Sequence, residues 1–437
     1  MISIINGKQI KKKLLRKDII FIKKNVEDVF NKIYLSPEEI IDSLDKFVKD
    51  LKHSEIKELY DCLLFEGLTE IYAKNMLKST IDGFRKDYIN KRLYVEFLGY
   101  PFVNKKINDY IEEKFVPLGI LIHITSSNSP NNPILSLLDG LITGNINIIK
   151  MPSSPSSFSE KLICMLVEKR KELTPYIYLL KLSSSQQDFL KDIILLSDCV
   201  VVWGSDRAVK GIKELTSHKK KIVSWGHRIS FAYVSYNFKY DKKILKLICK
   251  DICVTNQLAC NAPQCIFVDV KNRKELLIFS NTFASCMKEI SPEYPLTNLD
   301  VHEQSEITTQ VMLAKAGQVL GKKFVIEDDE KNWRIIVDYE SKLKFSPLFR
   351  TVLIMPVKKN KIADCILHLR EYLQTAVVCC NKNELFEIQD ILIRSGVTRI
   401  CLPGESHCSY IGEPHDGKYP LREYVNRIRL IRTQKNN

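Results

Sequence analysis

Short apolar runs alternate with amphipathic segments from residue 116 to residue 402, and this pattern strongly limits how the chain can fold. Short continuous apolar runs are typical of buried strands, whereas apolar residues at helical spacing are typical of helices packed on a sheet. Strands that alternate with helices pair in parallel and carry helices on both faces of the sheet. We therefore predict an α/β protein built from doubly wound parallel sheets.

Two such units are predicted, one after an N-terminal helical region and one before a loop-rich end. Residues 1–228 are expected to form the first domain and residues 229–402 the second. Residues 403–437, which are rich in glycine and proline, are expected to form a C-terminal segment. The predicted strands are Gly119–Thr125, Ile146–Lys150, Ile177–Leu182, Cys199–Trp203, Phe231–Val234, Gln264–Val270, Arg334–Val337, Thr351–Val357, Thr375–Cys380 and Arg399–Leu402.

Capping residues predict where three helices begin. Ser36-Pro37-Glu38-Glu39 combines a serine cap, a proline at the first helical position and a glutamate that completes a capping box. Ser157 and Glu160 predict a second capping box. Asp206, which follows Gly204-Ser205, is expected to cap a third helix.

The sequence lacks the patterns of a membrane-spanning, exported or metal-binding protein. No apolar run reaches the ~18 residues that a spanning helix needs. The first lysines follow an apolar run, which is the reverse of a signal peptide. The 13 cysteines include no CxxC pair, so neither a zinc site nor a disulfide framework is expected. We expect a cytoplasmic protein that binds no metal.

The formal net charge of +14 leaves three interpretations open. It is compatible with a nucleic-acid partner, with a basic surface that has no specific ligand, and with attraction of phosphate-rich ligands such as a dinucleotide or coenzyme A. Charge alone does not separate them.

Polar residues follow two predicted strands of the first unit. The cluster that begins at Ser126 and contains Asn128 follows one strand, and Lys150 ends the next. Ligands of open α/β sheets bind beyond the carboxyl ends of strands, where Asn128 could present its amide and Lys150 could meet a ribose or a phosphate. The alternative is that these are turn residues without a ligand.

Cys260 is the candidate nucleophile. It lies in the polar loop Asn256–Gln264, between a predicted helix and a predicted strand, and loops on a rigid scaffold often carry reactive groups. Its neighbours Cys253 and Cys265 are expected to be packed inside that helix and that strand. His227, in the segment Ser224–Arg228, is a candidate general base, and its alternative is a histidine without a catalytic role.

Several short segments, in this order along the chain, resemble the aldehyde dehydrogenase superfamily over residues 84–425. They are Pro117-Leu118-Gly119, Ser127-Asn128-Ser129-Pro130, Gly144-Asn145, Gly204-Ser205, Asn256-Gln257 through Cys260 with Pro263-Gln264, Leu348-Phe349-Arg350-Thr351, Leu373-Gln374-Thr375, Gly396-Val397-Thr398-Arg399, and His415-Asp416-Gly417 with Pro420-Leu421. The Cys260 loop, Leu373-Gln374-Thr375 and His415-Asp416-Gly417 resemble one branch in particular, the LuxC-type fatty acid reductases of bacterial bioluminescence.

The resemblance implies an aldehyde-dehydrogenase-like fold. In such a fold, residues 1–228 contain the dinucleotide-binding domain and residues 229–402 form the catalytic cysteine domain. Residues 403–437 pack back on the side of the protein that binds the cofactor and forms the oligomer. It implies that Cys260 is the nucleophile. Asn128 then forms the oxyanion hole together with the backbone N–H of Cys260. The implied cofactor-binding residues are Ser126, Lys150, Ser153, Gly204 and Ser205, with Gly204-Ser205 at the turn where the pyrophosphate approaches a helix N-terminus.

Three departures from the superfamily pattern bear on the reaction. Ser224 stands where oxidising members carry the glutamate that activates water, so His227 becomes the nearest base, with Cys260 as its target. Ser153 stands where many NAD-preferring members carry a glutamate on the ribose, which favours NADPH and leaves NADH open. Val209 replaces a second glycine, and the glutamate expected near Phe345–Phe349 is missing.

The resemblance therefore implies an NADPH-dependent long-chain acyl-CoA reductase that forms an S-acyl intermediate on Cys260 and releases a fatty aldehyde. It further implies an acyl-CoA or acyl-protein donor, an acyl-protein synthetase partner and a homo-oligomer, without a nucleic-acid partner. The main alternative is a coenzyme-A-acylating aldehyde dehydrogenase for short-chain aldehydes. An acyltransferase or thioesterase without a redox step and a basic nucleic-acid-binding protein are more distant alternatives.

Overall fold

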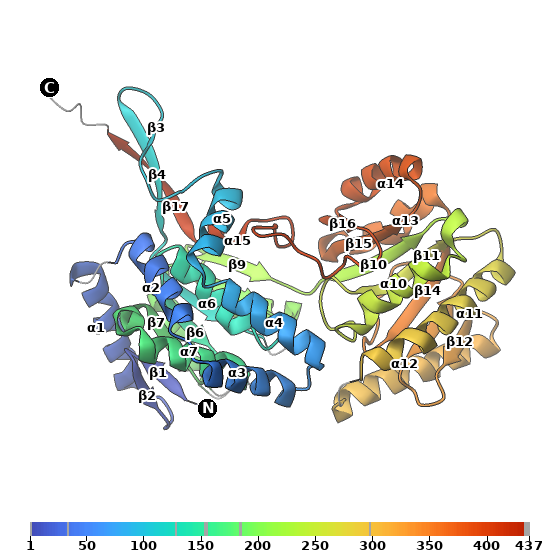
Figure 1. Ribbon diagram of the computed structural model, residues 1–437, viewed down its shortest axis with the longest axis horizontal. Coiled ribbons are helices and arrows are strands. Elements are labelled where there is room, and N and C mark those ends of the chain that lie inside the picture. Colours follow the sequence, from blue (N-terminus) through green and yellow to red (C-terminus); the bar gives the residue numbers. More distant parts are fainter. Residues whose placement is uncertain are drawn as a thin grey trace. The chain divides into compact units, whose positions relative to one another are not determined.

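The computed structural model describes residues 2–32, 35–126, 129–152, 156–182, 186–296 and 299–431. The chain forms two compact units, Met1–Gly226 with Tyr410–Asn437 and His227–Ser409 (Figure 1). The second unit thus extends past residue 402, where the sequence places its end. Its last segment is tied to it by Asp251, whose carboxylate accepts hydrogen bonds from the backbone N–H groups of Gly404 and Ser406.

The first unit is a seven-stranded sheet with helices on both faces and a separate three-stranded sheet. Its elements are β1 (Ser3–Ile5), β2 (Lys8–Ile10), α1 (Arg16–Lys32), α2 (Pro37–Lys49), α3 (His53–Phe65), α4 (Glu70–Asp82), α5 (Lys86–Phe97), β3 (Lys105–Lys106), β4 (Ile111–Pro117), β5 (Ile120–Ile124), α6 (Asn132–Ile142), β6 (Ile146–Lys150), α7 (Ser157–Lys169), β7 (Ile177–Leu180), α8 (Gln187–Leu196), β8 (Cys199–Trp203), α9 (Asp206–Leu215), β9 (Lys221–Trp225), α15 (Pro420–Glu423) and β17 (Val425–Ile431).

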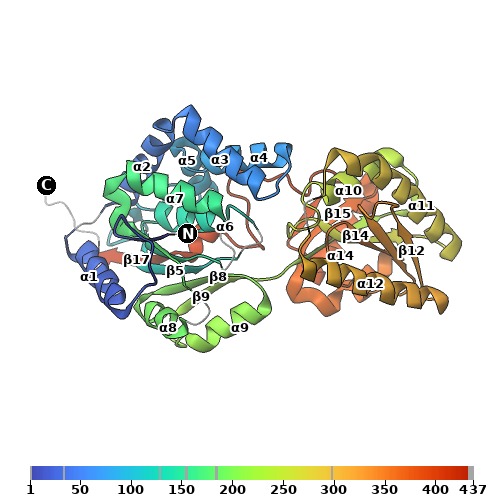
Figure 2. The ribbon, with the colours of Figure 1, turned by 90° about the horizontal axis from the view of Figure 1, so that it is seen from below.

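The large sheet of this unit has the strand order β2-β1-β7-β6-β5-β8-β9. Strands β5 to β9 pair in parallel, and the β1–β2 hairpin adds an antiparallel edge at β7. Figure 2 shows α6 and α7 over one face of the sheet and α8 and α9 over the other. The strands are therefore buried on both faces, which agrees with the uninterrupted apolar runs of the sequence.

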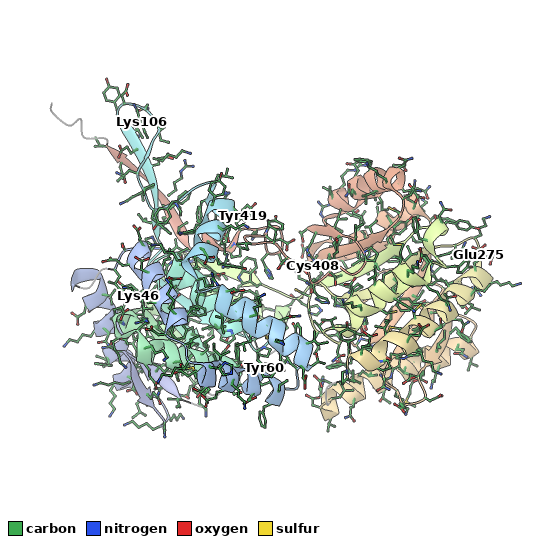
Figure 3. The ribbon with its side chains drawn as sticks, in the orientation of Figure 1. Lys46, Tyr60, Lys106, Glu275, Cys408 and Tyr419 are labelled. Carbon is green, nitrogen blue, oxygen red and sulfur yellow. The ribbon has the colours of Figure 1, made fainter. Side chains whose placement is uncertain are left out.

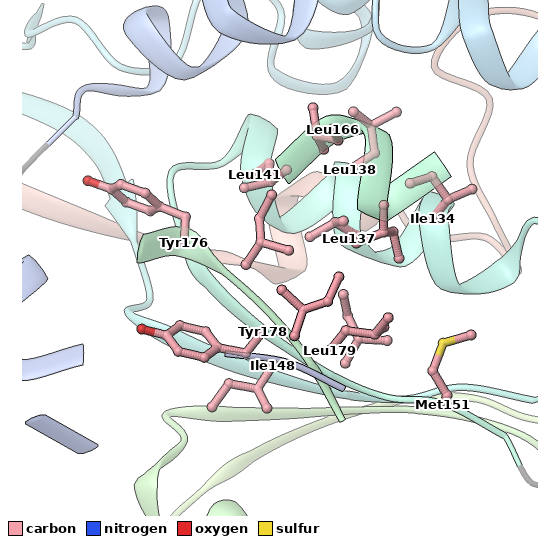
Figure 4. Packing of buried hydrophobic residues seen from close by; sticks show 14 of the residues in the cluster. Ile134, Leu137, Leu138, Leu141, Ile148, Met151, Leu166, Tyr176, Tyr178 and Leu179 are labelled. Atoms are coloured by element: carbon pink, nitrogen blue, oxygen red, sulfur yellow. The ribbon is translucent and has the colours of Figure 1, made fainter. Parts of the chain in front are cut away.

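Leucine side chains of α6 form the centre of this core. Leu137 and Leu141 are fully buried and pack over Ile148 and Leu179 of the sheet (Figure 4). Each large aliphatic side chain buried in this way stabilises the fold by about 1.5–3 kcal/mol relative to an exposed one. The core therefore holds the carboxyl ends of β5 and β6 in fixed positions.

Helix α2 begins as the sequence predicts, and two other helices begin with a different cap. Ser36 and Glu39 form the predicted capping box of α2. Helix α7 is capped by Ser156 instead of Ser157, since the Ser156 hydroxyl accepts the N–H of Ser159, and Glu160 accepts a hydrogen bond from the backbone N–H of Ile2. Helix α9 is capped by Ser205 and not by Asp206.

The second unit is a seven-stranded sheet of order β12-β13-β14-β11-β10-β15-β16, parallel except for β12. Its elements are β10 (Ile229–Val234), α10 (Lys242–Cys253), β11 (Pro263–Asp269), α11 (Arg273–Ile290), α12 (Val301–Val319), β12 (Lys323–Glu327), β13 (Arg334–Asp338), β14 (Thr351–Val357), α13 (Ile362–Ile366), β15 (Leu373–Cys379), α14 (Lys382–Ser395) and β16 (Arg399–Cys401). Successive strand residues enter two different cores, one under α10 and α11 and one under α12, α13 and α14.

Strands β3, β4, β9, β12 and β17 are absent from the sequence prediction, and β9 includes Ser224 and Trp225, which were expected to lie between strands. In β17, which pairs antiparallel with β4, the apolar residues Val425, Ile428 and Leu430 are separated by arginine or asparagine. Such a strand gives no continuous apolar run.

None of the described helices is long and apolar enough to cross a membrane.

Candidate functional site

The loop that carries Cys260 is folded tightly at the end of α10. Asn256 and Gln257 have left-handed backbone conformations, with φ of 52° and 63°. The turn is fixed because the backbone N–H of Gln257 bonds to the carbonyl of Ile252 at 3.1 Å. The Gln257 side chain also spans the loop and donates to the carbonyl of Pro263 at 2.9 Å. The cysteine is therefore presented by a short loop pinned at both ends.

Cys260 is exposed, whereas the two neighbouring cysteines are buried. Cys253 ends α10 and Cys265 lies within β11. Burial raises the pKa of the Cys253 thiol to about 11 and that of Cys265 to about 12, so both remain protonated near neutral pH. Of these three cysteines, Cys260 alone lies in a polar loop and is exposed to solvent.

Two side chains from neighbouring strands contact Cys260 directly. The Gln374 amide, from β15, donates a hydrogen bond to the Cys260 sulfur at 3.2 Å. The Ser230 hydroxyl, from β10, donates to the Cys260 backbone carbonyl at 2.6 Å and accepts the backbone N–H of Thr375 at 3.1 Å. Neither Ser230 nor Gln374 was predicted to have a role at the site, although Gln374 belongs to the Leu373-Gln374-Thr375 motif.

A buried arginine supports the cysteine loop from the other side. Arg350 is almost fully buried, and its guanidinium donates to the Asn256 side-chain oxygen at 2.7 Å and to the Ser291 and Tyr294 carbonyls. Burial lowers the pKa of Arg350. Leu348, Phe349 and Arg350 all have positive φ, a conformation that costs free energy for residues other than glycine. The Leu348-Phe349-Arg350-Thr351 motif thus has a structural role beside the loop.

His227 lies at the start of the same unit, two residues before β10. Its ring packs against Phe345 with centroids 4.8 Å apart, and Phe345 packs edge-on against Tyr372 at 5.6 Å. Tyr372 directly precedes β15, which carries Gln374. The role of His227 as the base for Cys260 stays a prediction.

The cysteine lies at an unexpected edge of its sheet. Ser230, Pro263 and Leu373 are at the amino ends of β10, β11 and β15, so the Cys260 loop is at the amino edge of these parallel strands. Ligands of open α/β sheets usually bind at the opposite, carboxyl edge. The candidate cofactor residues of the first unit do follow that rule.

Lys150 ends β6 at the carboxyl edge of the first sheet. Burial lowers the pKa of its ammonium group. Among the described residues, no oxygen pairs with that ammonium, although the Lys150 carbonyl accepts the hydroxyl of Thr125 at 3.1 Å. A half-buried cation with no oxygen partner among the described residues fits a ligand that brings its own oxygens. Ser126 lies at the same edge, after β5, and accepts a hydrogen bond from Asn132 at 3.1 Å.

Gly204 and Ser205 connect β8 to α9, as the sequence predicts for a phosphate-binding turn. Gly204 has φ of 156°, and a Cβ at this position would lie 3.3 Å from the Cβ of Ala208. The Ser205 hydroxyl accepts the N–H of Ala208 and caps α9. Val209, which replaces the second glycine, is buried in the core and therefore does not obstruct the helix N-terminus. These residues fit a dinucleotide, whose phosphates are well placed at a helix N-terminus.

Asn128 and Ser153 lie outside the described residues. Ser224 lies within β9 and supplies no carboxylate. In the described part of the chain, no group of three or more histidine, cysteine, aspartate or glutamate side chains could hold a metal ion.

Curated relatives align with most of this chain. Long-chain acyl-protein thioester reductase 2 of Photobacterium leiognathi is 25% identical over 318 residues, which cover 72% of this chain and 64% of that protein. The long-chain acyl-protein thioester reductase of Aliivibrio fischeri is 23% identical over 315 residues, which cover 71% of this chain and 64% of that protein. The chain therefore matches less than two thirds of the length of these relatives.

Comparison with solved structures and with a family model identifies the fold and the family of the chain. Aldehyde dehydrogenase 21 of Physcomitrella patens, in complex with succinate, matches with a TM-score of 0.77 and 16% identity over 100% of this chain and 98% of that one. GapN of Methanocaldococcus jannaschii, a glyceraldehyde-3-phosphate dehydrogenase complexed with NADP, matches with a TM-score of 0.75 and 16% identity over 99% and 98%. The fold is thus that of the aldehyde dehydrogenases. The model of the acyl-CoA reductase (LuxC) family matches residues 33–427, and the chain belongs to that family.

Proposed function

We propose that this chain reduces a long-chain acyl thioester to a fatty aldehyde with NADPH, through an acyl group carried on Cys260. The observation that carries the proposal is an exposed thiol in a pinned polar loop, with the Gln374 amide 3.2 Å from its sulfur. Family membership and the names of the relatives support the acyl thioester as substrate.

In the first step, the Cys260 thiolate attacks the thioester carbonyl carbon, and the donor thiol leaves. Asn128 and the Cys260 backbone N–H are the proposed oxyanion donors, and each such donor typically contributes about 3 kcal/mol. His227 is the proposed base for the thiol. Ser224 offers no carboxylate to activate water, which protects the acyl-enzyme from hydrolysis.

The second step requires a nicotinamide cofactor, which supplies a hydride to the acyl carbon when bound. Lys150 and the turn at Gly204 and Ser205 are the proposed holders of its ribose and phosphates. Ser153 in place of a carboxylate supports NADPH, because a serine does not repel a 2′-phosphate. The C–S bond to Cys260 then breaks, which releases the aldehyde and restores the thiolate.

The proposed donor is an acyl-protein or acyl-CoA, and the proposed partner is a synthetase that supplies the acyl group. The relatives are named as acyl-protein thioester reductases, which supports the first of these donors. We also propose a homo-oligomer, and the +14 charge supports attraction of phosphate-rich ligands.

The test is NADPH consumption by the purified chain over a series of acyl-CoA chain lengths, with NADH in parallel and aldehyde identified by mass spectrometry. We expect consumption with long-chain thioesters and a loss of at least about 100-fold in Cys260→Ser. Cys408→Ser is the matched control, because Cys408 is also exposed and lies on the loop after β16 (Figure 3). Full aldehyde formation by Cys260→Ser would refute the proposal.

A further inference from the structure

The sheet of the second unit is irregular at the level of the cysteine loop. On β15, Gln374 and Thr375 both lie opposite Ser230 of β10, so the parallel ladder has an extra residue there. On β11, Gln264 lies between Pro263 and Cys265, which pair with Ser230 and Phe231 of β10, so β11 also has an extra residue there. Bulges are rare in parallel pairs, and they redirect a side chain where they occur. Here two bulges flank a single residue, Ser230.

The bulges have two direct consequences for polar groups. They take the backbone N–H of Thr375 out of the ladder, and the Ser230 hydroxyl accepts it instead at 3.1 Å. The same hydroxyl donates to the Cys260 carbonyl at 2.6 Å. Ser230 thus joins the bulge of β15 to the cysteine loop through one oxygen atom.

The side chain of Gln374 is held in one orientation. It is only 6% exposed. Its backbone carbonyl accepts the N–H of Thr398 at 3.0 Å and the Thr398 hydroxyl at 3.3 Å. The Thr375 hydroxyl donates to the Gln374 amide oxygen at 3.4 Å, which turns the amide nitrogen toward the Cys260 sulfur.

We propose that Gln374 is a catalytic hydrogen-bond donor to the sulfur of Cys260 and that Ser230 is the positioning residue that aims it. The proposal rests on the proposed function for its place in the reaction, because Cys260 must be the nucleophile. A neutral amide that donates to sulfur stabilises the thiolate without introducing a charge. A carboxylate in its place would accept instead of donate, and would repel the thiolate.

The donor acts in two steps of the proposed reaction. Before attack it stabilises the thiolate, whose electron pair forms the new C–S bond while the donor thiol leaves with the electrons of the old one. After hydride transfer from the reduced nicotinamide, the C–S bond to Cys260 breaks and its electron pair returns to sulfur. Gln374 then stabilises the departing thiolate, as the carbonyl of the aldehyde forms.

The test is the rate of iodoacetamide alkylation of Cys260 against pH, followed by peptide mass spectrometry on the full chain. Gln374→Met removes the donor at similar size, and Gln374→Glu keeps the acceptor for Thr375 but adds a charge. In Gln374→Met we expect the midpoint to rise by about one pH unit and the rate at neutral pH to fall about tenfold, with a larger shift in Gln374→Glu. Cys408, also exposed, is the internal reference within each sample.

Gln318→Glu is the matched charge control, because Gln318 is exposed on α12 and its side chain accepts the backbone N–H of Val325 at 3.0 Å. It should leave the Cys260 midpoint unchanged. A parental midpoint in Gln374→Met would overturn the proposal, and if that variant does not fold, Gln374→Ala, which also removes the donor without adding a charge, takes its place. Alkylation needs neither cofactor nor acyl donor. A shifted midpoint in a chain whose parent reduces no thioester would therefore refute the proposed function and leave the Gln374–Cys260 contact standing.

Discussion

Replacing Ser230 with alanine should destabilise the second unit more than an ordinary buried serine-to-alanine change. Ser230 is fully buried and forms hydrogen bonds to Thr375 and to Cys260. The Thr375 N–H is buried, so it stays unpaired in the variant, at a cost of about 1–3 kcal/mol. Cys260 itself is exposed, so its carbonyl can bond to water, and the loss of its hydrogen bond to Ser230 costs about 0.5–1 kcal/mol. The expected total is about 1.5–4 kcal/mol.

Ser280→Ala is the matched control in the same unit. Ser280 is equally buried, but its hydroxyl donates to the carbonyl of Leu276, one turn earlier in α11. A helix already satisfies that carbonyl with a backbone N–H, so the side-chain bond is redundant. We expect Ser280→Ala to cost less than about 1 kcal/mol.

The assay is urea unfolding followed by tryptophan fluorescence. The chain has three tryptophans, and Trp333, buried in the second unit, is the reporter once Trp203 and Trp225 of the first unit are changed to phenylalanine. Both serine variants are compared in that background, so its own effect cancels. Equal losses of unfolding free energy in the two variants would refute the assignment of Ser230 as a link between strand and loop.

Three further predictions concern other parts of the molecule. Burial lowers the pKa of Lys150, so affinity for NADPH should fall as pH rises through that lowered pKa, at lower pH than for an exposed lysine. Lys150→Met should weaken binding about tenfold and remove this pH dependence in fluorescence titrations. Burial lowers the pKa of His123 to about 4, so the first unit should lose stability as pH falls from about 6.5 to that value, and urea midpoints of His123→Gln should depend less on pH. Arg350→Met should lower the unfolding free energy by about 3 kcal/mol or more, because the Asn256, Ser291 and Tyr294 oxygens lose their donor. Urea titrations measure this loss, and a value under about 1 kcal/mol would contradict the prediction.

Features that depend on neighbouring residues were predictable from the sequence. The parallel strands of both units follow from continuous apolar runs, because a strand covered by helices on both faces has no polar side. The start of α2 follows from Ser36 and Glu39, which act on each other within one turn. The loop position of Cys260 follows from its polar neighbours in the same way.

Features that depend on distant residues were not predictable. Strand β15 was predicted to begin at Thr375, whereas it begins at Leu373 and includes Gln374. The bulge that aims Gln374 arises only when Ser230 lies opposite, and these residues are far apart in sequence. The caps of α7 and α9 were each misplaced by one residue, since adjacent polar residues compete for the same backbone N–H groups.

Each of the two units fills its own cores, and this separation bears on how a chain with the proposed function can diverge. Lys150 and Ser205 are set by packing in the first unit, whereas Gln374 and Cys260 are set by the second. Under the proposed function, changes that retune coenzyme preference in the first unit can therefore accumulate without disturbing the reactivity of the Cys260 thiol in the second. For protein engineering, the two properties form separate design problems, which libraries confined to one unit can address one at a time.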